Sequence, residues 1–308
     1  MRLRFGSPQR SRSSFGGARR GGSGVMRLVI AAVIALIAFG SYYFATSENP
    51  VTGKKERVGN VTESQEVAMG YAAAPQMVQQ MGGAVPPNSE KQRLVDDIGN
   101  RLLDAPYSEG RSVRQILEAN DVPWRFTFTL LDDDQTVNAF ALPGGPVFIT
   151  EALFDRLENE AQLAGVLGHE IGHVIERHGL ERIASANMYQ QLAGAVAVAA
   201  EDGSGRGYNA AMLAQTFGQM FQLGYSREAE LESDQYGLAS LVAAGWDPRE
   251  MVRVMEILRD ASGGGGGAPE FMQTHPHPES RIEAIRKFVQ ERFPDGVPDE
   301  LSTGRALR

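Results

Sequence analysis

Apolar residues recur along the chain with two different periods, and the changes of period predict its elements. Residues 61–118 keep the spacing of helices. Residues 124–130 alternate apolar with polar side chains, which predicts a half-buried strand, and residues 137–142 and 147–149 predict two further short strands. Helical spacing returns over residues 151–293. A few strands followed by a run of helices indicate an α+β domain that is mainly helical, with a small mixed β-sheet.

One segment near the N-terminus is uncharged and, as a helix, long enough to cross a lipid bilayer. Residues 28–47 contain no charged side chain, and a helix of this length spans roughly 30 Å at about 1.5 Å per residue. Seven arginines and no acid lie in residues 1–27. Because positive flanks stay in the cytoplasm, we expect a single-pass anchor of the inner membrane at residues 26–46, with the following chain on the periplasmic side. A cleaved signal peptide and a buried core helix are the alternatives.

Charge and composition narrow the chemistry. The chain has 308 residues and a net charge of −8, and the arginine-rich leader makes the remainder more acidic still, which argues against nucleic acid as a partner. It contains no cysteine, so any metal must be held by His, Asp or Glu. We expect a disordered basic tail at 1–25, the anchor at 26–46, a linker at 47–60, a main domain at 61–293 and a tail at 294–308. Within the main domain we expect a helical part at 61–120, the small sheet at 121–150 and a second helical part at 151–293.

The five histidines fall in two clusters, and the first has the spacing of a metal site. They are His169, His173, His178, His275 and His277. Residues 160–178 predict a helix, on which side chains four positions apart project side by side, so the imidazoles of His169 and His173 can meet one zinc ion at about 2.0–2.1 Å. Glu170 lies beside them but outside the ligand set, where a base that activates water belongs. The pattern predicts a zinc hydrolase site with one zinc ion per chain.

A catalytic zinc ion needs a third protein ligand. His178 lies nine residues after the first histidine ligand, about 180° round a continuous helix, and is expected to face away. Residues 225–244 predict a second helix, with Glu230 and Asp234 on one side of it. Spacing alone leaves Glu230 and Glu232 as candidates for the third ligand.

Four blocks of sequence resemble the gluzincin metallopeptidases of the HtpX, BepA and mitochondrial Oma type. The blocks occur in the order found in that family and cover roughly residues 126–281. They are Val137–Gly145, Gly168–His173, Ser226–Asp234, and Thr274–Pro276 followed by Arg281.

The resemblance implies a zincin-type catalytic domain and a role for each block. It implies that Glu230 is the third zinc ligand and that Asp234 orients a zinc-binding histidine. It also implies a catalytic place for His275 near the metal, where it steadies the oxyanion or occupies the open position in a resting state. Residues 138–145 correspond to an edge strand that aligns the substrate backbone. Its substrate-binding residues are Asn138, Ala139, Phe140 and Ala141. Pro146 cannot donate a ladder hydrogen bond, so we expect the strand after it to be short or at an edge.

These patterns predict a zinc-dependent endopeptidase whose water is activated by zinc and Glu170. Its substrates are expected to be unfolded or flexible segments of membrane or envelope proteins, as in protein quality control. The alternative is a zinc-containing chaperone-like or regulatory membrane protein with little proteolysis. Because Glu170 is not a ligand and a fourth position stays open, the pattern favours the enzyme. The sequence indicates no oligomeric state.

Overall fold

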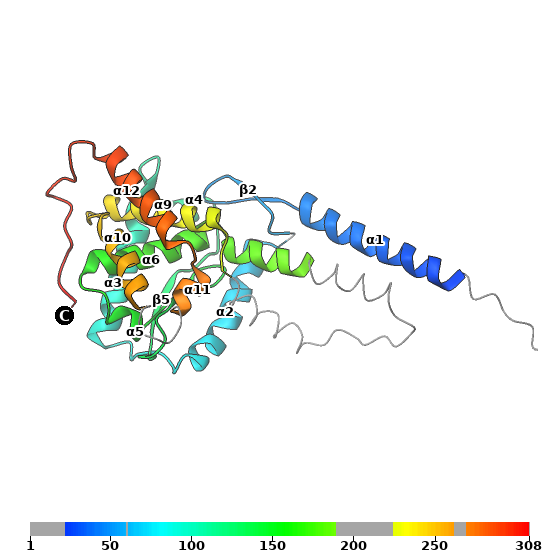
Figure 1. Cartoon of the computed structure of the whole chain (residues 1–308), viewed down its shortest axis with the longest axis horizontal. Coiled ribbons are helices and arrows are strands. Elements are labelled where there is room, and N and C mark those ends of the chain that lie inside the picture. The colour runs from blue at the N-terminus through cyan, green and yellow to red at the C-terminus, as the bar shows by residue number, and fades with distance from the viewer. Residues whose placement is uncertain (1–21, 60, 189–223, 262–268, 308) are drawn as a thin grey trace, which may run out of the picture.

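The computed structural model describes residues 22–59, 61–188, 224–261 and 269–307. A body of helices surrounds a small sheet, and the helix α1 projects from that body (Figure 1). The basic tail expected at residues 1–25 lies almost entirely outside the described residues.

The order of helices, small sheet and further helices agrees with the sequence-based prediction, whereas the short strands β1 to β4 were not predicted. The helices before the central sheet are α1 (Gly22–Phe44), α2 (Glu63–Gln80), α3 (Glu90–Asp104) and α4 (Val113–Ala119). The strands are β1 (Ser47–Glu48), β2 (Lys55–Glu56), β3 (Pro106–Ser108), β4 (Arg111–Ser112), β5 (Thr127–Leu131), β6 (Ala139–Ala141) and β7 (Pro146–Thr150). The later helices are α5 (Glu151–Phe154), α6 (Glu160–Ile175), α9 (Arg227–Ala243), α10 (Glu250–Ala261), α11 (Glu270–Thr274) and α12 (Pro278–Arg292).

The central sheet is mixed, as predicted, and has three strands in the order β5-β7-β6. Strand β7 pairs in parallel with β5 and antiparallel with β6. Among the strands that the structure describes, this order leaves β6 at an edge of the sheet. The expectation for Pro146 was wrong, because it begins the central strand β7. As the first residue of a strand, proline is tolerated there, since its missing N–H removes no interior ladder bond.

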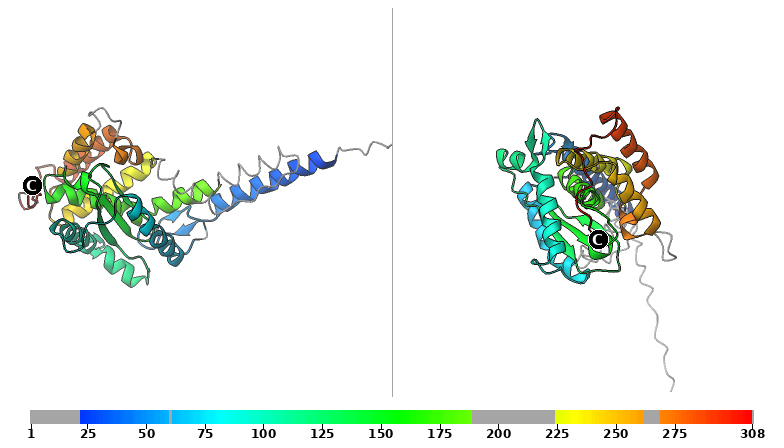
Figure 2. Two further views of the ribbon diagram at one scale, coloured as in Figure 1. Left: turned by 90° about the horizontal axis from the view of Figure 1, so that it is seen from below. Right: turned by 90° about the vertical axis from the view of Figure 1, so that its left-hand side faces the viewer.

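Helix α6 forms the centre of the helical part and is buried along its whole length. It packs against α9, α10 and α3. Figure 2 (right) shows the green α6 between the cyan N-terminal helices and the yellow-to-red C-terminal helices. Leu163, Leu167 and Ile171 are fully buried in this core. Because apolar neighbours surround α6, any polar residue on it is held in a nearly water-free environment.

The hairpin of β1 and β2 follows α1 in the sequence and contacts the C-terminal end of α6. Asn49 in the hairpin donates hydrogen bonds to the carbonyl of Ile175 at 2.7 Å and to the carboxylate of Glu56 at 2.5 Å. Arg177, just after α6, forms an ion pair with Glu66 of α2 at 3.0 Å.

A membrane-spanning helix was predicted from the sequence at residues 26–46. Among the residues that the structure describes, no helix combines the length and the apolar content needed to cross a membrane.

Candidate metal centre

Helix α6 holds the first three site residues away from solvent. Asn159 caps its N-terminus, where its side chain accepts a hydrogen bond from the Gln162 amide at 3.0 Å. His169, Glu170 and His173 are each no more than 2% exposed. The rings of His169 and His173 lie side by side, as their spacing predicted, with centroids 4.6 Å apart.

Helix α9 approaches α6 closely and supplies a carboxylate. A Cβ atom added at Gly172 would lie only 2.9 Å from Cα of Ser233, so a glycine is needed for this approach. The approach brings Glu230, which is fully buried, beside the two imidazoles. Spacing alone left Glu230 and Glu232 open, and the structure separates them. Glu232 lies instead against His178, with Oε2 3.2 Å from Nε2 of that ring.

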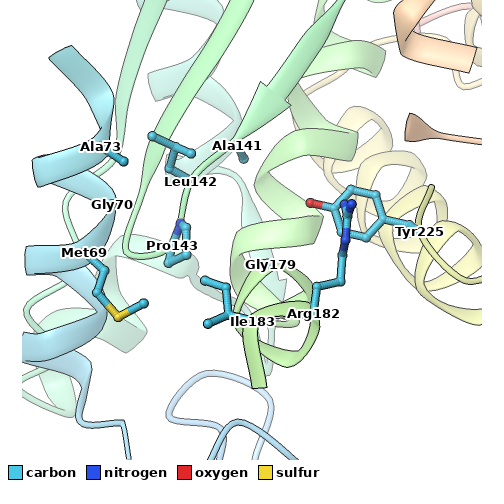
Figure 3. A pocket seen from close by; sticks show the side chains of 10 residues that line it. All are labelled: Met69, Gly70, Ala73, Ala141, Leu142, Pro143, Gly179, Arg182, Ile183 and Tyr225. Carbon is cyan, nitrogen blue, oxygen red and sulfur yellow. The ribbon is translucent and has the colours of Figure 1, made fainter. Parts of the chain in front are cut away.

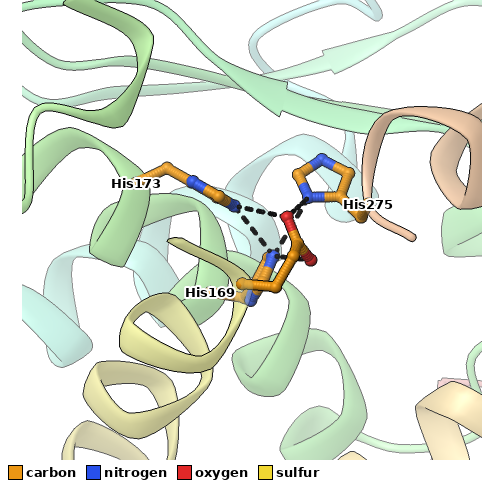
Figure 4. Close-up of side chains that lie close together, drawn as sticks. His169, His173 and His275 are labelled. Carbon is orange, nitrogen blue, oxygen red and sulfur yellow. Dashed lines mark hydrogen bonds and ion pairs between the residues drawn. The ribbon is translucent and has the colours of Figure 1, made fainter. Parts of the chain in front are cut away.

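His275, at the C-terminal end of α11, completes a cluster of four possible metal donors. One ligand atom from each of His169, His173, Glu230 and His275 lies within 4.8 Å of the other three (Figure 4). Nε2 of His169 lies 3.0 Å from Nε2 of His173 and 3.1 Å from Nδ1 of His275. Oε1 of Glu230 lies 3.1 Å from Nδ1 of His275. Ligand atoms 2.0–2.1 Å from one tetrahedral ion are about 3.3 Å apart, so these separations suit a single metal ion.

Several polar atoms in and beside this cluster have no hydrogen-bond partner within the described part of the chain. They are both carboxylate oxygens of Glu170 and Nε2 of His275. The distance between Oε1 of Glu170 and Nε2 of His275 is 3.6 Å, too long for a hydrogen bond. Because buried polar atoms normally have partners, these atoms fit a site that receives a cation and a polar ligand.

Burial and charge keep the donors in the forms that bind metals. Burial lowers the pKa of His169 to about 4 and lowers the pKa of His173 well below its ordinary value, so both imidazoles are neutral near pH 7. Burial acts to raise the pKa of Glu230, but His275 and Arg281 outweigh it and hold that pKa well below its ordinary value. Metals bind neutral imidazole and ionised carboxylate, so the cluster is ready to bind one.

Asp234 and Arg281 support the donors from outside. Oδ1 of Asp234 lies 2.9 Å from Nδ1 of His169, which is the contact that the resemblance implied. Arg281 of α12 is fully buried and pairs with Asp234 at 2.6 Å and with Glu230 at 2.7 Å. In the sequence Arg281 stood out only as part of a motif, without a predicted role. A lone arginine in an amphipathic helix carries no sign of which carboxylates it meets.

The expectation that His178 faces away from the site was wrong. It assumed that the helix continues to His178, but α6 ends at Ile175, and Arg177 has a φ of 52°. This left-handed residue turns the chain back, so Nδ1 of His178 lies 3.0 Å from Nδ1 of His173. His178 is nevertheless not among the four clustered donors.

An apolar pocket opens beside the edge strand β6 (Figure 3). Its lining comes from α2, the end of β6, the segment after α6 and the residues just before α9, and includes Met69, Ala73, Ala141, Ile183 and Tyr225. A smaller pocket shares Ala141 and Tyr225 with it and is also lined by His173. The apolar pocket therefore adjoins the metal centre. The four predicted substrate-binding residues lie in β6 or immediately before it, and β6 packs against α6.

Two histidines from one helix and a carboxylate from another, around a buried glutamate without a partner, define the metallohydrolase class of site. Residues 109–289 match the model described as Peptidase family M48. The chain belongs to peptidase family M48, which confirms the metallopeptidase resemblance of its sequence.

Curated relatives agree with this assignment. The beta-barrel assembly-enhancing protease of Escherichia coli (strain K12) is 30% identical over 275 residues, which are 86% of this chain and 53% of the relative. The mitochondrial metalloendopeptidase OMA1 of Schizosaccharomyces pombe is 30% identical over 259 residues, which are 83% of this chain and 71% of the relative. A relative from Vibrio cholerae is 35% identical, and the match covers 61% of this chain and 40% of that protein. The chain thus spans about half the length of these bacterial relatives.

Proposed function

We propose that this protein is a zinc endopeptidase, with residues 61–293 as its metallopeptidase domain. The observation that carries the proposal is the position of Glu170, a buried carboxylate without a hydrogen-bond partner among the described residues, beside four clustered metal donors. A structural metal site has no use for such a group, whereas a hydrolase needs a base next to its metal.

In this proposal His169, His173 and Glu230 hold the metal. Zinc suits a donor set of two imidazoles and one carboxylate, and when bound it supplies Lewis-acid polarisation of the scissile carbonyl and a lowered pKa for water. His275 would either occupy the fourth position of the resting site or steady the developing oxyanion of the substrate. Its Nε2 atom has no partner in the described part of the chain and remains free to donate.

Glu170 performs the proton transfers. Burial raises its pKa to about 7, with Glu230 adding to the rise and His275 opposing it. A carboxylate with this pKa can take a proton from water near neutral pH and pass it to the leaving amine, without a covalent intermediate. Its side chain is 1% exposed, so bulk water does not compete for the proton.

The test is the substitution Glu170→Gln, which keeps the shape of the side chain and removes its basicity. Zinc content should stay at one ion per chain, and cleavage of an unfolded protein such as casein should be lost. Glu283→Gln, at an exposed position on α12, is the matched control and should retain full activity. Cleavage by Glu170→Gln at the unaltered rate would remove the proposal. Zinc binding without cleavage by the unaltered protein would favour a chaperone-like or regulatory role.

Strand β6 and its apolar pocket suggest how a substrate is held. An edge strand accepts an extended peptide through main-chain hydrogen bonds, which selects unfolded or flexible segments. We propose that a substrate strand binds along residues 138–141 and places an apolar side chain in the pocket lined by Ala73 and Ala141. We propose membrane or envelope proteins as the substrates, with a role in their quality control; the bacterial relative is named for enhancing beta-barrel assembly.

We also propose that α1 attaches the domain to a membrane. The helix exposes large apolar side chains: Val25, Met26, Leu28, Val29, Ile30, Val33, Leu36, Ile37, Phe39, Tyr43 and Phe44. Exposed apolar surface of this extent favours contact with lipid. The arginines of residues 1–27 favour a cytoplasmic N-terminus and a periplasmic domain. The full chain should sediment with membranes, and a variant without residues 22–44 should not. Full-length protein in the soluble fraction would contradict this attachment.

A further inference from the structure

We propose that His178, held by Glu232, is a positioning residue for the metal-binding ring of His173. The inference rests on the proposed zinc site. It adds to that site a series of hydrogen bonds through His178, which the sequence predicted to face away from the metal. His178 is 4% exposed and lies behind His173, on the side away from the four donors.

The contact depends on how α6 ends. After Ile175 the chain leaves the helix, and Arg177 takes a left-handed conformation with a φ of 52°. This turn brings the ring of His178 to 5.0 Å from the ring of His173, at an interplanar angle of 73°. In a continuous helix the two residues, five positions apart, would point in clearly different directions. The ending of α6 therefore builds the contact.

If His173 binds metal, the hydrogen bonds from His173 through His178 to Glu232 can run in only one direction. Because Nε2 of His173 is the atom that faces the other donors, its neutral ring carries the hydrogen on Nδ1. That N–H donates to Nδ1 of His178, 3.0 Å away, which must then be without a hydrogen. His178 consequently carries its own hydrogen on Nε2, which faces Oε2 of Glu232 at 3.2 Å. Each donor meets an acceptor along the whole chain.

Glu232 remains an acceptor because its own surroundings favour the carboxylate. Lys54 Nζ lies 3.0 Å from Glu232 and 2.8 Å from Glu176. Ser233 adds a hydroxyl 3.3 Å from Nδ1 of His178. Lys54, in the segment between β1 and β2, thus fixes the carboxylate at the outer end of this series of hydrogen bonds.

The two histidine ligands therefore have different supports. His169 meets the carboxylate of Asp234 directly at 2.9 Å, whereas His173 meets the carboxylate of Glu232 through a second imidazole. A partner that fixes the tautomer and direction of a ligand ring typically changes metal affinity by about 10–100-fold. We expect His178 to act on zinc affinity and not on substrate.

The experiment compares two substitutions of similar shape, of which only one offers a hydrogen-bond acceptor. In His178→Asn the side-chain oxygen can occupy the place of Nδ1 and accept the hydrogen bond from His173, whereas His178→Leu offers no acceptor. The zinc dissociation constant is measured by competition with a chelator. It should rise about 10–100-fold in His178→Leu and by no more than about threefold in His178→Asn. Glu232→Gln should fall between them. The matched control is His277→Asn, at an exposed left-handed position, which should bind zinc like the unaltered protein.

Two further readings separate positioning from packing. The visible spectrum of the cobalt-substituted protein should change in His178→Leu and return in His178→Asn, because the direction of the His173 ring alters the ligand field. The urea midpoint of the metal-free proteins monitors folding. Equal zinc affinity in all variants would overturn the inference, and so would an equal loss in His178→Leu and His178→Asn. If the unaltered protein itself binds no zinc, the proposed function fails with it. Zinc binding without proteolysis overturns only the proposed function.

Discussion

Arg281 donates two hydrogen bonds to the carboxylate of Asp234, from Nε to Oδ2 at 2.7 Å and from Nη2 to Oδ1 at 2.6 Å. Its third nitrogen pairs with Glu230 at 2.7 Å. One buried guanidinium from α12 thus compensates a metal donor and the carboxylate that orients His169. The final helix of the domain is for this reason part of the site.

The substitution Arg281→Met should destabilise the metal-free protein strongly. It leaves the carboxylates of Glu230 and Asp234 buried without their cation, and breaking a buried ion pair costs about 3–5 kcal/mol. Urea denaturation in the presence of EDTA measures the loss. Arg286→Met, at an exposed position of the same helix, should change the free energy of unfolding by no more than about 0.5 kcal/mol. Similar losses in both variants would show that α12, and not the ion pair, is sensitive.

The parts of the site that lie on one helix were predictable from the sequence, because helical spacing fixes which side chains meet. His169, Glu170 and His173 needed only that rule. Glu230 and His275 come from other elements, and spacing left the choice of carboxylate open until the resemblance was considered. The pairing of Arg281 and the reversal at Arg177 depend on tertiary packing and on one left-handed residue, which no periodicity reveals. The α+β class and the mixed sheet were predicted correctly, whereas the central position of β7 was missed because Pro146 suggested an edge.

The contact between α6 and α9 predicts that Gly172→Ala lowers the free energy of unfolding, opposite to the usual effect of this change in a helix. In an uncrowded helix this change stabilises by roughly 1 kcal/mol. Here the new Cβ would lie 2.9 Å from Cα and 3.0 Å from the carbonyl oxygen of Ser233. Backbone cannot move aside as a flexible side chain does, so we expect a loss of about 1–3 kcal/mol together with weaker zinc binding. Urea denaturation and chelator competition measure the two effects.

Gly165→Ala is the matched control on the same helix. Its new Cβ would meet Cγ of Met251 at 3.0 Å and Cγ2 of Val254 at 4.0 Å, both of which belong to side chains. A methionine side chain can shift, so this variant should be near neutral and should bind zinc normally. Stabilisation by both alanines would contradict the importance of the close approach.

Glu56 predicts a pH dependence of stability. Arg177 serves two buried carboxylates, with Glu66 at 3.0 Å and Glu56 at 3.8 Å. Burial is the largest cause that raises the pKa of Glu56 from 4.5 to about 8. The folded state therefore holds this proton more tightly than the unfolded state. The resulting stabilisation is fully present below pH 4.5 and is lost as the pH rises through about 8.

The comparison of the unaltered protein with Glu56→Gln isolates this group. Glutamine keeps the shape of the protonated side chain and does not titrate. Urea midpoints of the metal-free proteins between about pH 5 and pH 8 should fall more steeply for the unaltered protein than for the variant. Parallel curves would contradict the raised pKa.

The apolar pocket beside β6 predicts a change in substrate binding that leaves the metal untouched. Ala73 of α2 lines this pocket, on the opposite side from Tyr225, which stacks on His173 with ring centroids 4.0 Å apart. Ala73→Phe should fill the pocket with a ring and exclude the apolar side chain of a substrate strand. Losing the burial of one such side chain costs about 1.5–3 kcal/mol, so kcat/KM for an unfolded protein should fall roughly 10–150-fold. Zinc affinity should not change.

Ala72→Phe, one position away on the exposed face of α2, should leave kcat/KM unchanged. Equal losses in both variants would show that α2 tolerates no bulk, and unchanged activity in Ala73→Phe would remove the pocket from substrate binding.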